Sequence, residues 1–207
     1  MDLSNPARAV SPSLDLAVLV VLAGTSRPLT GREVHRLCGH SQRGVQEVLN
    51  RMSSHGLVDA VDAGSARLYT LNREHVAADA VILLSDLREQ LFKRMRSHLR
   101  SWTVEPVAAA VFGSAARGDG GTESDIDVLV VRPDDVAHDD PSWTDAVDDL
   151  SLAIKRWTGN HASIIQATTS EVADMIDRDE TIVEELASDA VSLTEVGVLD
   201  VHRQVLS

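Results

Sequence analysis

The chain has few of the residues that mark secreted, membrane or disulfide-stapled proteins. Only one of its 207 residues is a cysteine, and aromatic residues make up 3%. Cys38 cannot form an internal disulfide and has no companion at metal-ligand spacing, so disulfide scaffolds and cysteine-built zinc sites are excluded. No run approaches the ~18 apolar residues of a membrane span, and residues 1–10 lack the features of a signal peptide. We therefore expect a cytoplasmic protein without a membrane partner.

Basic residues are scarce overall but concentrated in one part of the chain. The net charge is −13. Residues 26–73 hold seven arginines against four acidic residues, whereas residues 104–200 hold five basic and 22 acidic residues. This asymmetry indicates that the first part could contact nucleic acid and that the second part would repel it.

Residues 13–72 show a helical pattern followed by a hairpin pattern. Three helices are expected: one over 13–23, one that begins after the N-cap Thr30 and ends at Gly39, and one over 41–55. Two strands are expected after them, over 57–62 and 67–71. This order resembles a winged helix-turn-helix, which implies that 41–55 is the recognition helix and 57–72 the wing. Side chains on its polar side are suited to contact DNA bases and phosphates, although the face could equally be only solvated: Gln42, Arg43, Gln46, Asn50 and Arg51.

A long helix is expected over roughly residues 74–102. Its apolar residues recur at steps of three and four, from Ala80 to Trp102. Such a stripe needs a packing partner. The partner is either the domains that flank the helix or a second chain, so a homodimer through residues 74–103 is one possibility.

The remaining sequence alternates strand and helix patterns. Strands are expected at 107–112, 126–131, 161–168 and 190–194, and helices at 141–157, 170–178 and 180–188. With mixed pairing, these elements give an α/β sheet with helices on one side. The many aspartates at 134–149 are expected to be solvated charges, some favoured by a helix N-terminus, with a second metal site as the alternative.

Residues 112–131, FGSAARGDGGTESDIDVLVV, carry the strongest chemical signal. Asp125 and Asp127 lie two apart at the start of a strand, so their side chains project to one face. Paired carboxylates suit Mg²⁺, a hard cation that is often shared with substrate phosphates. Gly113 and Gly118 let the backbone approach a ligand closely, and the Ser114 hydroxyl and the loop N–H groups could donate to a triphosphate, together with Arg117.

The pattern G-S-x-x-R-G followed by S-D-I-D resembles the signature of the polymerase-β-like nucleotidyltransferases, most of all their minimal bacterial branch. The resemblance covers roughly residues 104–194. It implies that Asp125 and Asp127 are catalytic residues that hold Mg²⁺ and that a nucleoside triphosphate is the substrate. It further implies nucleotide-binding roles for a set of loop residues: Gly113, Ser114, Arg117, Gly118 and Ser124. For Arg117 the resemblance implies either phosphate binding or stabilisation of the loop.

The family's third carboxylate, on a later strand that faces the aspartate pair, is missing here. The corresponding strand, 161–168, contains no acid. Gln166 is the residue predicted nearest that position, with Ser163 second, and a glutamine can coordinate a metal but cannot accept a proton. Glu171 could substitute, but it is expected instead to begin a helix with Ser170 as N-cap.

The sequence therefore predicts a two-domain α+β or α/β protein. The expected parts are a winged helix-turn-helix at 1–73, a connecting helix at 74–103, a nucleotidyltransferase-like domain at 104–195 and a tail at 196–207. One hypothesis is a Mg²⁺-dependent enzyme that transfers a nucleoside monophosphate to an unknown acceptor. The alternative is a DNA-binding transcription regulator or toxin–antitoxin component whose nucleotidyltransferase domain binds nucleotide or metal without turnover.

Overall fold

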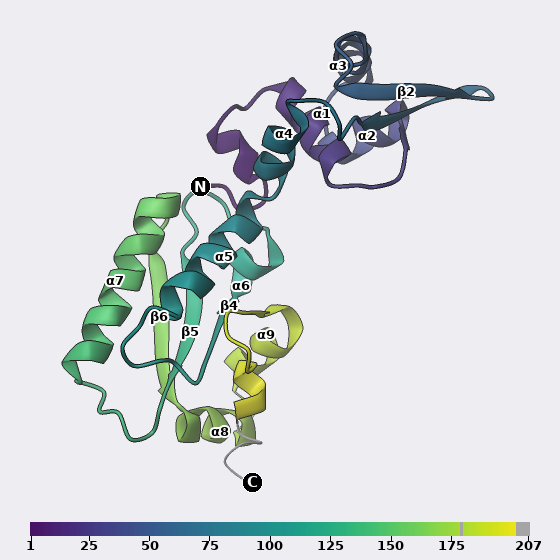
Figure 1. Ribbon diagram of the computed structural model, residues 1–207. Coiled ribbons are helices and arrows are strands. Elements are labelled where there is room, and N and C mark those ends of the chain that lie inside the picture. The colour runs from purple at the N-terminus through teal and green to yellow at the C-terminus, as the bar shows by residue number, and fades with distance from the viewer. Residues whose placement is uncertain (179, 202–207) are drawn as a thin grey trace. The chain divides into compact units, whose positions relative to one another are not determined.

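The computed structural model describes residues 1–178 and 180–201, which form two compact units. One unit comprises Asn5–Leu87, and the other combines Met1–Ser4 with the chain from Arg88 onward. Each has its own sheet, so the protein is a mixed α+β protein (Figure 1). Within the described residues no helix is both long and apolar enough to cross a membrane.

The first unit contains a helical part and a three-stranded antiparallel sheet. Its elements are η1 (Pro6–Ala9), α1 (Leu14–Ala23), β1 (Leu29–Thr30), α2 (Gly31–Cys38), α3 (Gln42–Ser54), β2 (Val58–Ala63), β3 (Ala66–Leu71) and α4 (Ala78–Ser85). The strand order is β1-β3-β2. The three helices and the hairpin expected from the sequence are confirmed, whereas the short helix η1 and the two-residue β1 were not expected.

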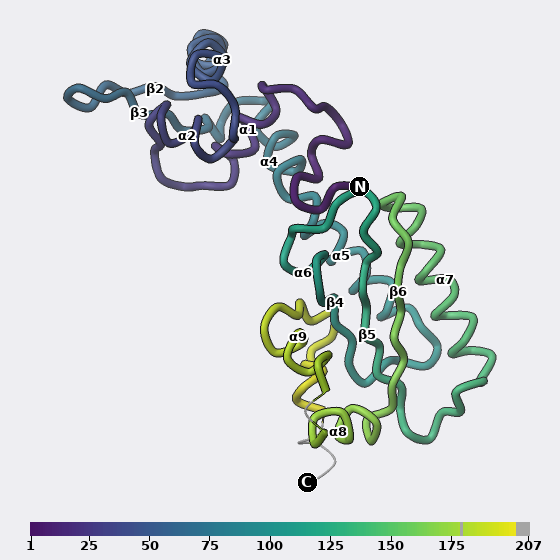
Figure 2. The backbone as a smooth tube through the Cα atoms, turned by 180° about the vertical axis from the view of Figure 1, so that it is seen from behind, coloured from purple at the N-terminus to yellow at the C-terminus, as the bar shows by residue number. Residues whose placement is uncertain are grey.

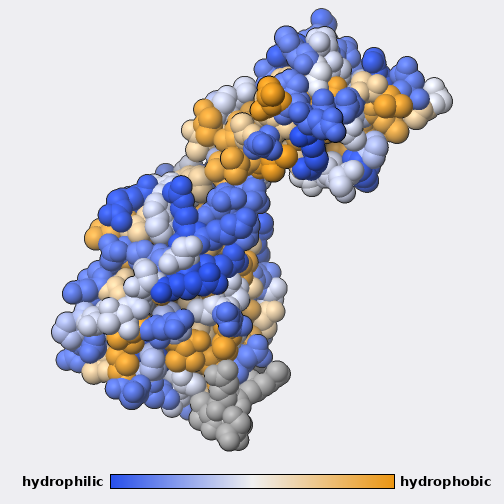
Figure 3. Space-filling model, viewed as in Figure 1, coloured by the Kyte–Doolittle hydropathy of each residue, from blue (hydrophilic) through white to orange (hydrophobic). Residues whose placement is uncertain are grey.

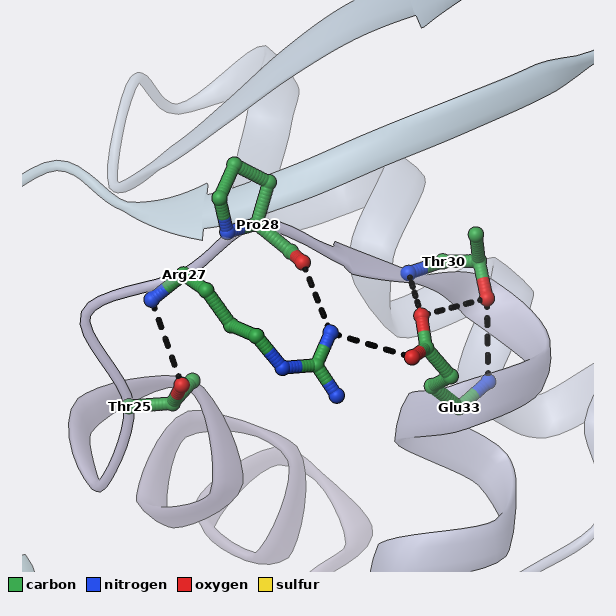
Figure 4. A network of polar contacts seen from close by, with 5 residues as sticks. All are labelled: Thr25, Arg27, Pro28, Thr30 and Glu33. Atoms are coloured by element: carbon green, nitrogen blue, oxygen red, sulfur yellow. Dashed lines mark hydrogen bonds and ion pairs between the residues drawn. The ribbon is translucent and has the colours of Figure 1, made fainter.

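The start of α2 shows how local sequence chemistry sets these boundaries. Thr30 caps the helix by accepting from the Glu33 N–H at 3.2 Å, and the Glu33 carboxylate accepts from the Thr30 N–H at 2.8 Å (Figure 4). The Arg27 guanidinium lies 3.0 Å from the same carboxylate. The hydrogen bonds from Thr30, together with Arg27, lower the pKa of Glu33 to about 2. The helix ends at Gly39, whose φ of 70° is the left-handed conformation that favours glycine.

The helix expected over 74–102 is divided into α4 and α5 (Leu87–Leu99) by a turn at Asp86. Ser85 donates its hydroxyl to the Ile82 carbonyl at 2.8 Å, a local bond that competes with the helical ladder. The apolar stripe is also divided. Val81 packs in the core of the first unit, and Leu91 and Met95 pack in the core of the second. The buried apolar residues that suggested a homodimer therefore pack within the chain.

The second unit is built on a mixed four-stranded sheet, in the order β6-β5-β4-β7. The strands are β4 (Ala108–Phe112), β5 (Ile126–Arg132), β6 (Ala162–Thr168) and β7 (Val191–Ser192). The helical elements are α5, α6 (Gly113–Arg117), α7 (Pro141–Thr158), α8 (Thr169–Asp177), α9 (Thr181–Asp189) and η2 (Val198–Asp200). The expected strands and helices are confirmed, with α6 and η2 as additions. Residues 202–207 of the predicted tail lie outside the described residues.

Helices cover both faces of this sheet, so the prediction of helices on one side is wrong. On one face Val128 and Val130 pack with α5 and with Trp143 of α7. On the other face Leu129 and Val131 pack with α8 and α9. Figures 1 and 2 show the two sides of the unit in turn. The unbroken apolar run of β5 is the sequence signal for this burial on both faces.

Two aspartates near this sheet have simple structural roles. Asp140 caps α7 by accepting from the Trp143 N–H at 3.1 Å. Asp134 accepts from the Ser170 N–H at 3.2 Å near the start of α8. The N-cap of α8 is Thr168, which forms a capping box with Glu171, so the prediction of Ser170 as N-cap is wrong by two residues. On the face of the second unit drawn in Figure 3, hydrophilic residues cover most of the surface.

Candidate active site

The end of β4 leads directly into the short helix α6 at Gly113. This residue has φ of +64°, and a Cβ placed on it would lie 2.9 Å from Oδ2 of Asp127. Phe112 and Asp127 are register partners in the antiparallel pair β4–β5. Glycine is therefore needed twice here, for the backbone conformation and for the close approach of the Asp127 carboxylate.

The loop after α6 folds back on Ser114. The Ser114 carbonyl accepts from the N–H groups of Gly118, Asp119 and Gly120 at 2.9, 3.1 and 3.2 Å. These N–H groups were expected to donate to a triphosphate, and in the structure they are used to close the loop. The Ser114 hydroxyl lies beside Gly120, where an added Cβ would be 3.0 Å away, so the lack of a side chain there leaves the hydroxyl room.

Arg117 connects this loop to α9. Its guanidinium lies 3.2 Å from the carboxylate of Asp119 and 3.3 Å from that of Asp189. Hydrogen bonds first to Asp119 and then to Asp189 raise the pKa of Arg117. Of the two predicted roles, phosphate binding and loop stabilisation, these contacts serve the second.

Asp127 lies on the face of the sheet that α8 and α9 cover, together with Leu129 and Val131, and Asp125 directly precedes β5. Asp127 is the one half-buried residue in β5, whose other six residues are buried. Burial chiefly raises the pKa of Asp127, repulsion from Asp125 and Glu185 raises it further, and Arg117 and a Ser163 hydrogen bond partly offset the rise. Asp125 is thus close enough to destabilise the charge of Asp127, a repulsion that a bound cation would relieve.

Gln166 does not lie beside the aspartates, so its prediction as the nearest polar residue on β6 is wrong. In the parallel pair β5–β6, Asp127 is the register partner of Ser163, and Gln166 is three residues further along. An odd number of steps places a side chain on the opposite face of a strand. There the Gln166 Oε1 accepts from Nε1 of the buried Trp143 at 2.7 Å. Ser163, ranked second from the sequence, is the residue next to Asp127.

Sequence reasoning missed two residues that act on this site. The charge of Glu185 on α9 raises the pKa of Asp127. Glu185 lies one helical turn before Asp189, the partner of Arg117. The spacing of four residues was visible, but only the fold brings α9 to the aspartates. The second missed residue, Asn160, holds the loop before Asp125.

The donor set fits a cation that keeps most of its water. Across residues 1–178 and 180–201, no three His, Cys, Asp or Glu side chains are grouped closely enough to hold a metal ion by themselves. Asp125 and Asp127 would provide two carboxylates, and substrate phosphate and water would complete the coordination of Mg²⁺. The same observation leaves the second metal site considered for residues 134–149 without support.

The predicted DNA-binding residues on α3 are largely engaged within the first unit. Gln46 donates its side-chain amide to the Tyr69 hydroxyl at 2.8 Å and to Asn50 Oδ1 at 3.0 Å. Arg51 forms an ion pair with Asp15 of α1. Arg43 is 2.9 Å from Glu47, but its side chain is 92% exposed, and Gln42 is exposed as well. All five residues of the predicted set are exposed, and the Arg43 side chain is more exposed than that of Arg51, which is 49% exposed.

Comparison with known proteins supports one part of the sequence interpretation. Residues 88–184 match the family model described as a nucleotidyltransferase domain, which supports such a domain in the second unit. The matched segment contains α5, Gly113, both aspartates and β6. Among proteins with curated descriptions, none matches the chain significantly.

Two solved structures are similar to part of the chain. One is a predicted DNA-binding transcriptional regulator from E. coli, 28% identical over 36% of this chain and 76% of its own, with a TM-score of 0.30. The other is human N-acetylserotonin methyltransferase in complex with SAM, 14% identical over 46% of this chain and 30% of its own, with a TM-score of 0.29. Both TM-scores are too low to carry an argument about fold or function.

Proposed function

We propose that the second unit is a Mg²⁺-dependent nucleotidyltransferase that binds a nucleoside triphosphate and transfers the nucleoside monophosphate to an acceptor. The observation that carries this proposal is the position of the Asp127 carboxylate against Gly113 at the start of α6, with Asp125 close enough to repel it. The family match over residues 88–184 supports the same activity.

Each residue of this site has a distinct task in the proposed reaction. Asp125 and Asp127 bind Mg²⁺, which supplies charge neutralisation for the phosphates when bound. The Ser114 hydroxyl donates to a phosphate oxygen. Gly113 keeps the space beside the carboxylates open for the triphosphate. Arg117 holds the loop to α9 through Asp119 and Asp189.

Turnover should be slow in this proposal, because Ser163 is the residue that lies next to Asp127 on β6. Ser163 donates a hydrogen bond to Asp127 but is too weak a base to accept a proton from an incoming hydroxyl. A missing general base costs typically ~10²–10⁴-fold in rate. The alternative hypothesis, binding without turnover, is the limiting case of the same deficiency.

Release of pyrophosphate from labelled triphosphates in Mg²⁺ would test the proposal. Wild type should release pyrophosphate slowly, and Asp125→Asn or Asp127→Asn should abolish the release. Asp135→Asn is a matched control, because Asp135 is an exposed aspartate in the same unit away from the site. Equal release by wild type and both site variants would refute the assignment, whereas binding without release would favour the regulator.

As a second function, we propose that the first unit is a winged helix-turn-helix that contacts DNA through α3. The exposed Gln42 and Arg43 favour this possibility. The unit as a whole contains eight arginines and eight acidic residues, so such binding would be weak and sensitive to salt. Retention of the full chain on DNA at low salt should fall in Arg43→Ala. Equal retention of the variant and wild type would exclude this face.

A further inference from the structure

The loop Gly118–Ser124 carries the chain from α6 to Asp125 without regular secondary structure. Three of its N–H groups are used within the turn, as described above, but its carbonyl groups face residues from distant parts of the chain. These contacts decide where the first aspartate lies relative to the second.

Asn160 makes the most extensive of these contacts. It lies between α7 and β6 and is only 3% exposed. Its side-chain Nδ2 donates to the carbonyls of Gly121, Thr122 and Ser124 at 3.2, 3.4 and 2.9 Å. The next residue, His161, accepts from the Ile126 N–H at 2.9 Å. Residues 160–161 therefore hold the backbone on both sides of Asp125.

Two more residues of the same unit hold the beginning of the loop. The Leu3 N–H donates to the Gly120 carbonyl at 2.8 Å, and the Leu3 side chain is buried in the core beneath α5 and α7. The Arg88 guanidinium lies against Gly118, where a Cβ would be 1.6 Å from its Nη1. The loop is thus fixed by residues near positions 3, 88 and 160. Figure 2 shows the N-terminus at the end of the sheet where these segments meet.

We propose that Asn160 is a positioning residue for the nucleotide site. By holding the carbonyls of Gly121, Thr122 and Ser124, its amide sets the place of Asp125 beside Asp127 and thereby the affinity for Mg²⁺ with nucleotide. This inference rests on the proposed function of the aspartate pair. A buried amide that lies outside the G-S-x-x-R-G and S-D-I-D motifs thus sets the distance between the two aspartates.

The test compares Asn160→Asp and Asn160→Ala with wild type. Asn160→Asp keeps the shape of the side chain and the oxygen that accepts from the Met1 ammonium, but replaces the donor by an oxygen that repels the three carbonyls. Asn72→Asp is a matched control, because Asn72 also donates its amide to a backbone carbonyl, that of Gly56 at 2.8 Å, in the other unit. Leu3→Ala loosens the loop from its other end and serves as a second route if the Asn160 variants fold poorly.

Two measurements separate this inference from the proposed function. Amide hydrogen exchange of peptides covering residues 118–126 should rise in both Asn160 variants and in Leu3→Ala but not in Asn72→Asp. Calorimetry in Mg²⁺ should show at least about tenfold weaker nucleotide affinity in the Asn160 variants than in wild type. Unchanged exchange or unchanged affinity in folded Asn160 variants would overturn the inference. If wild type itself binds no nucleotide, the proposed function fails, and exchange still decides whether Asn160 holds the loop.

Discussion

Replacing Ser163 by aspartate should restore the third carboxylate that the site lacks. Ser163 is the register partner of Asp127 on the neighbouring parallel strand and already hydrogen-bonds to it. Ser163→Asp therefore places a new carboxylate on the same face of the sheet as the pair. Gln166→Glu adds the same charge to the same strand but on the opposite face, against Trp143, and is the matched control.

The metal-free variant should be less stable than wild type. Neighbouring strands are about 4.8 Å apart, so the two carboxylates would lie about 5 Å from each other. Their repulsion costs about 1 kcal/mol at the dielectric constant of water and about 3 kcal/mol at an effective value near 20. Loss of the Ser163 hydrogen bond to Asp127 adds about 1 kcal/mol. The expected loss of unfolding free energy is thus about 2 to 4 kcal/mol.

Mg²⁺ with nucleotide should reverse this loss, because the three carboxylates then share a cation. Urea unfolding with and without Mg²⁺ and triphosphate would measure both effects, and pyrophosphate release would measure turnover. We expect Ser163→Asp to raise turnover by up to ~10²–10⁴-fold, the usual range for a general base. A rate increase in Gln166→Glu but not in Ser163→Asp would show that the assignment of the two faces of β6 is wrong.

Three further substitutions probe other parts of the structure. Asp127→Asn should raise the melting temperature of the metal-free protein at neutral pH, because the pKa of Asp127 is raised; the gain should vanish as pH falls and the wild-type carboxyl becomes protonated, which a series of melts would show. Glu33→Gln should lower the melting temperature at neutral pH, because the pKa of the Glu33 carboxyl is lowered to about 2. The difference from wild type should disappear between about pH 4.5 and 2, and a constant difference down to pH 2 would contradict this. Trp143→Phe should cost about 2 to 4 kcal/mol in urea unfolding, since it leaves a cavity and removes the hydrogen bond to Gln166; a loss below 1 kcal/mol would show that this bond is unimportant.

Most secondary-structure elements could be predicted because their signals are local. Thr30 and Glu33 form a capping box three residues apart, and Gly39 and Gly159 end helices in the left-handed conformation. The aspartate pair and Gly113 were likewise visible as a motif. Their mutual contact follows from strand pairing between neighbouring segments of the chain.

Register and distant contacts could not be predicted. The choice between Ser163 and Gln166 depends on a pairing register that a single sequence does not specify, and an error of one residue reverses the face. Asn160 carries no motif, and its role exists only because α7 returns the chain to the loop before Asp125. The break between α4 and α5 lies within a stretch of continuous apolar periodicity, which by itself predicts one helix.

Calorimetric titration of the full chain with each of the four nucleoside triphosphates, in Mg²⁺ and then in EDTA, would decide whether the aspartate pair and the Gly113 turn form a nucleotide site. We predict that at least one triphosphate binds in Mg²⁺ and that binding is lost in EDTA and in the Asp125→Asn, Asp127→Asn double variant. Absence of binding for all four in Mg²⁺, or equal binding by the double variant, would contradict it.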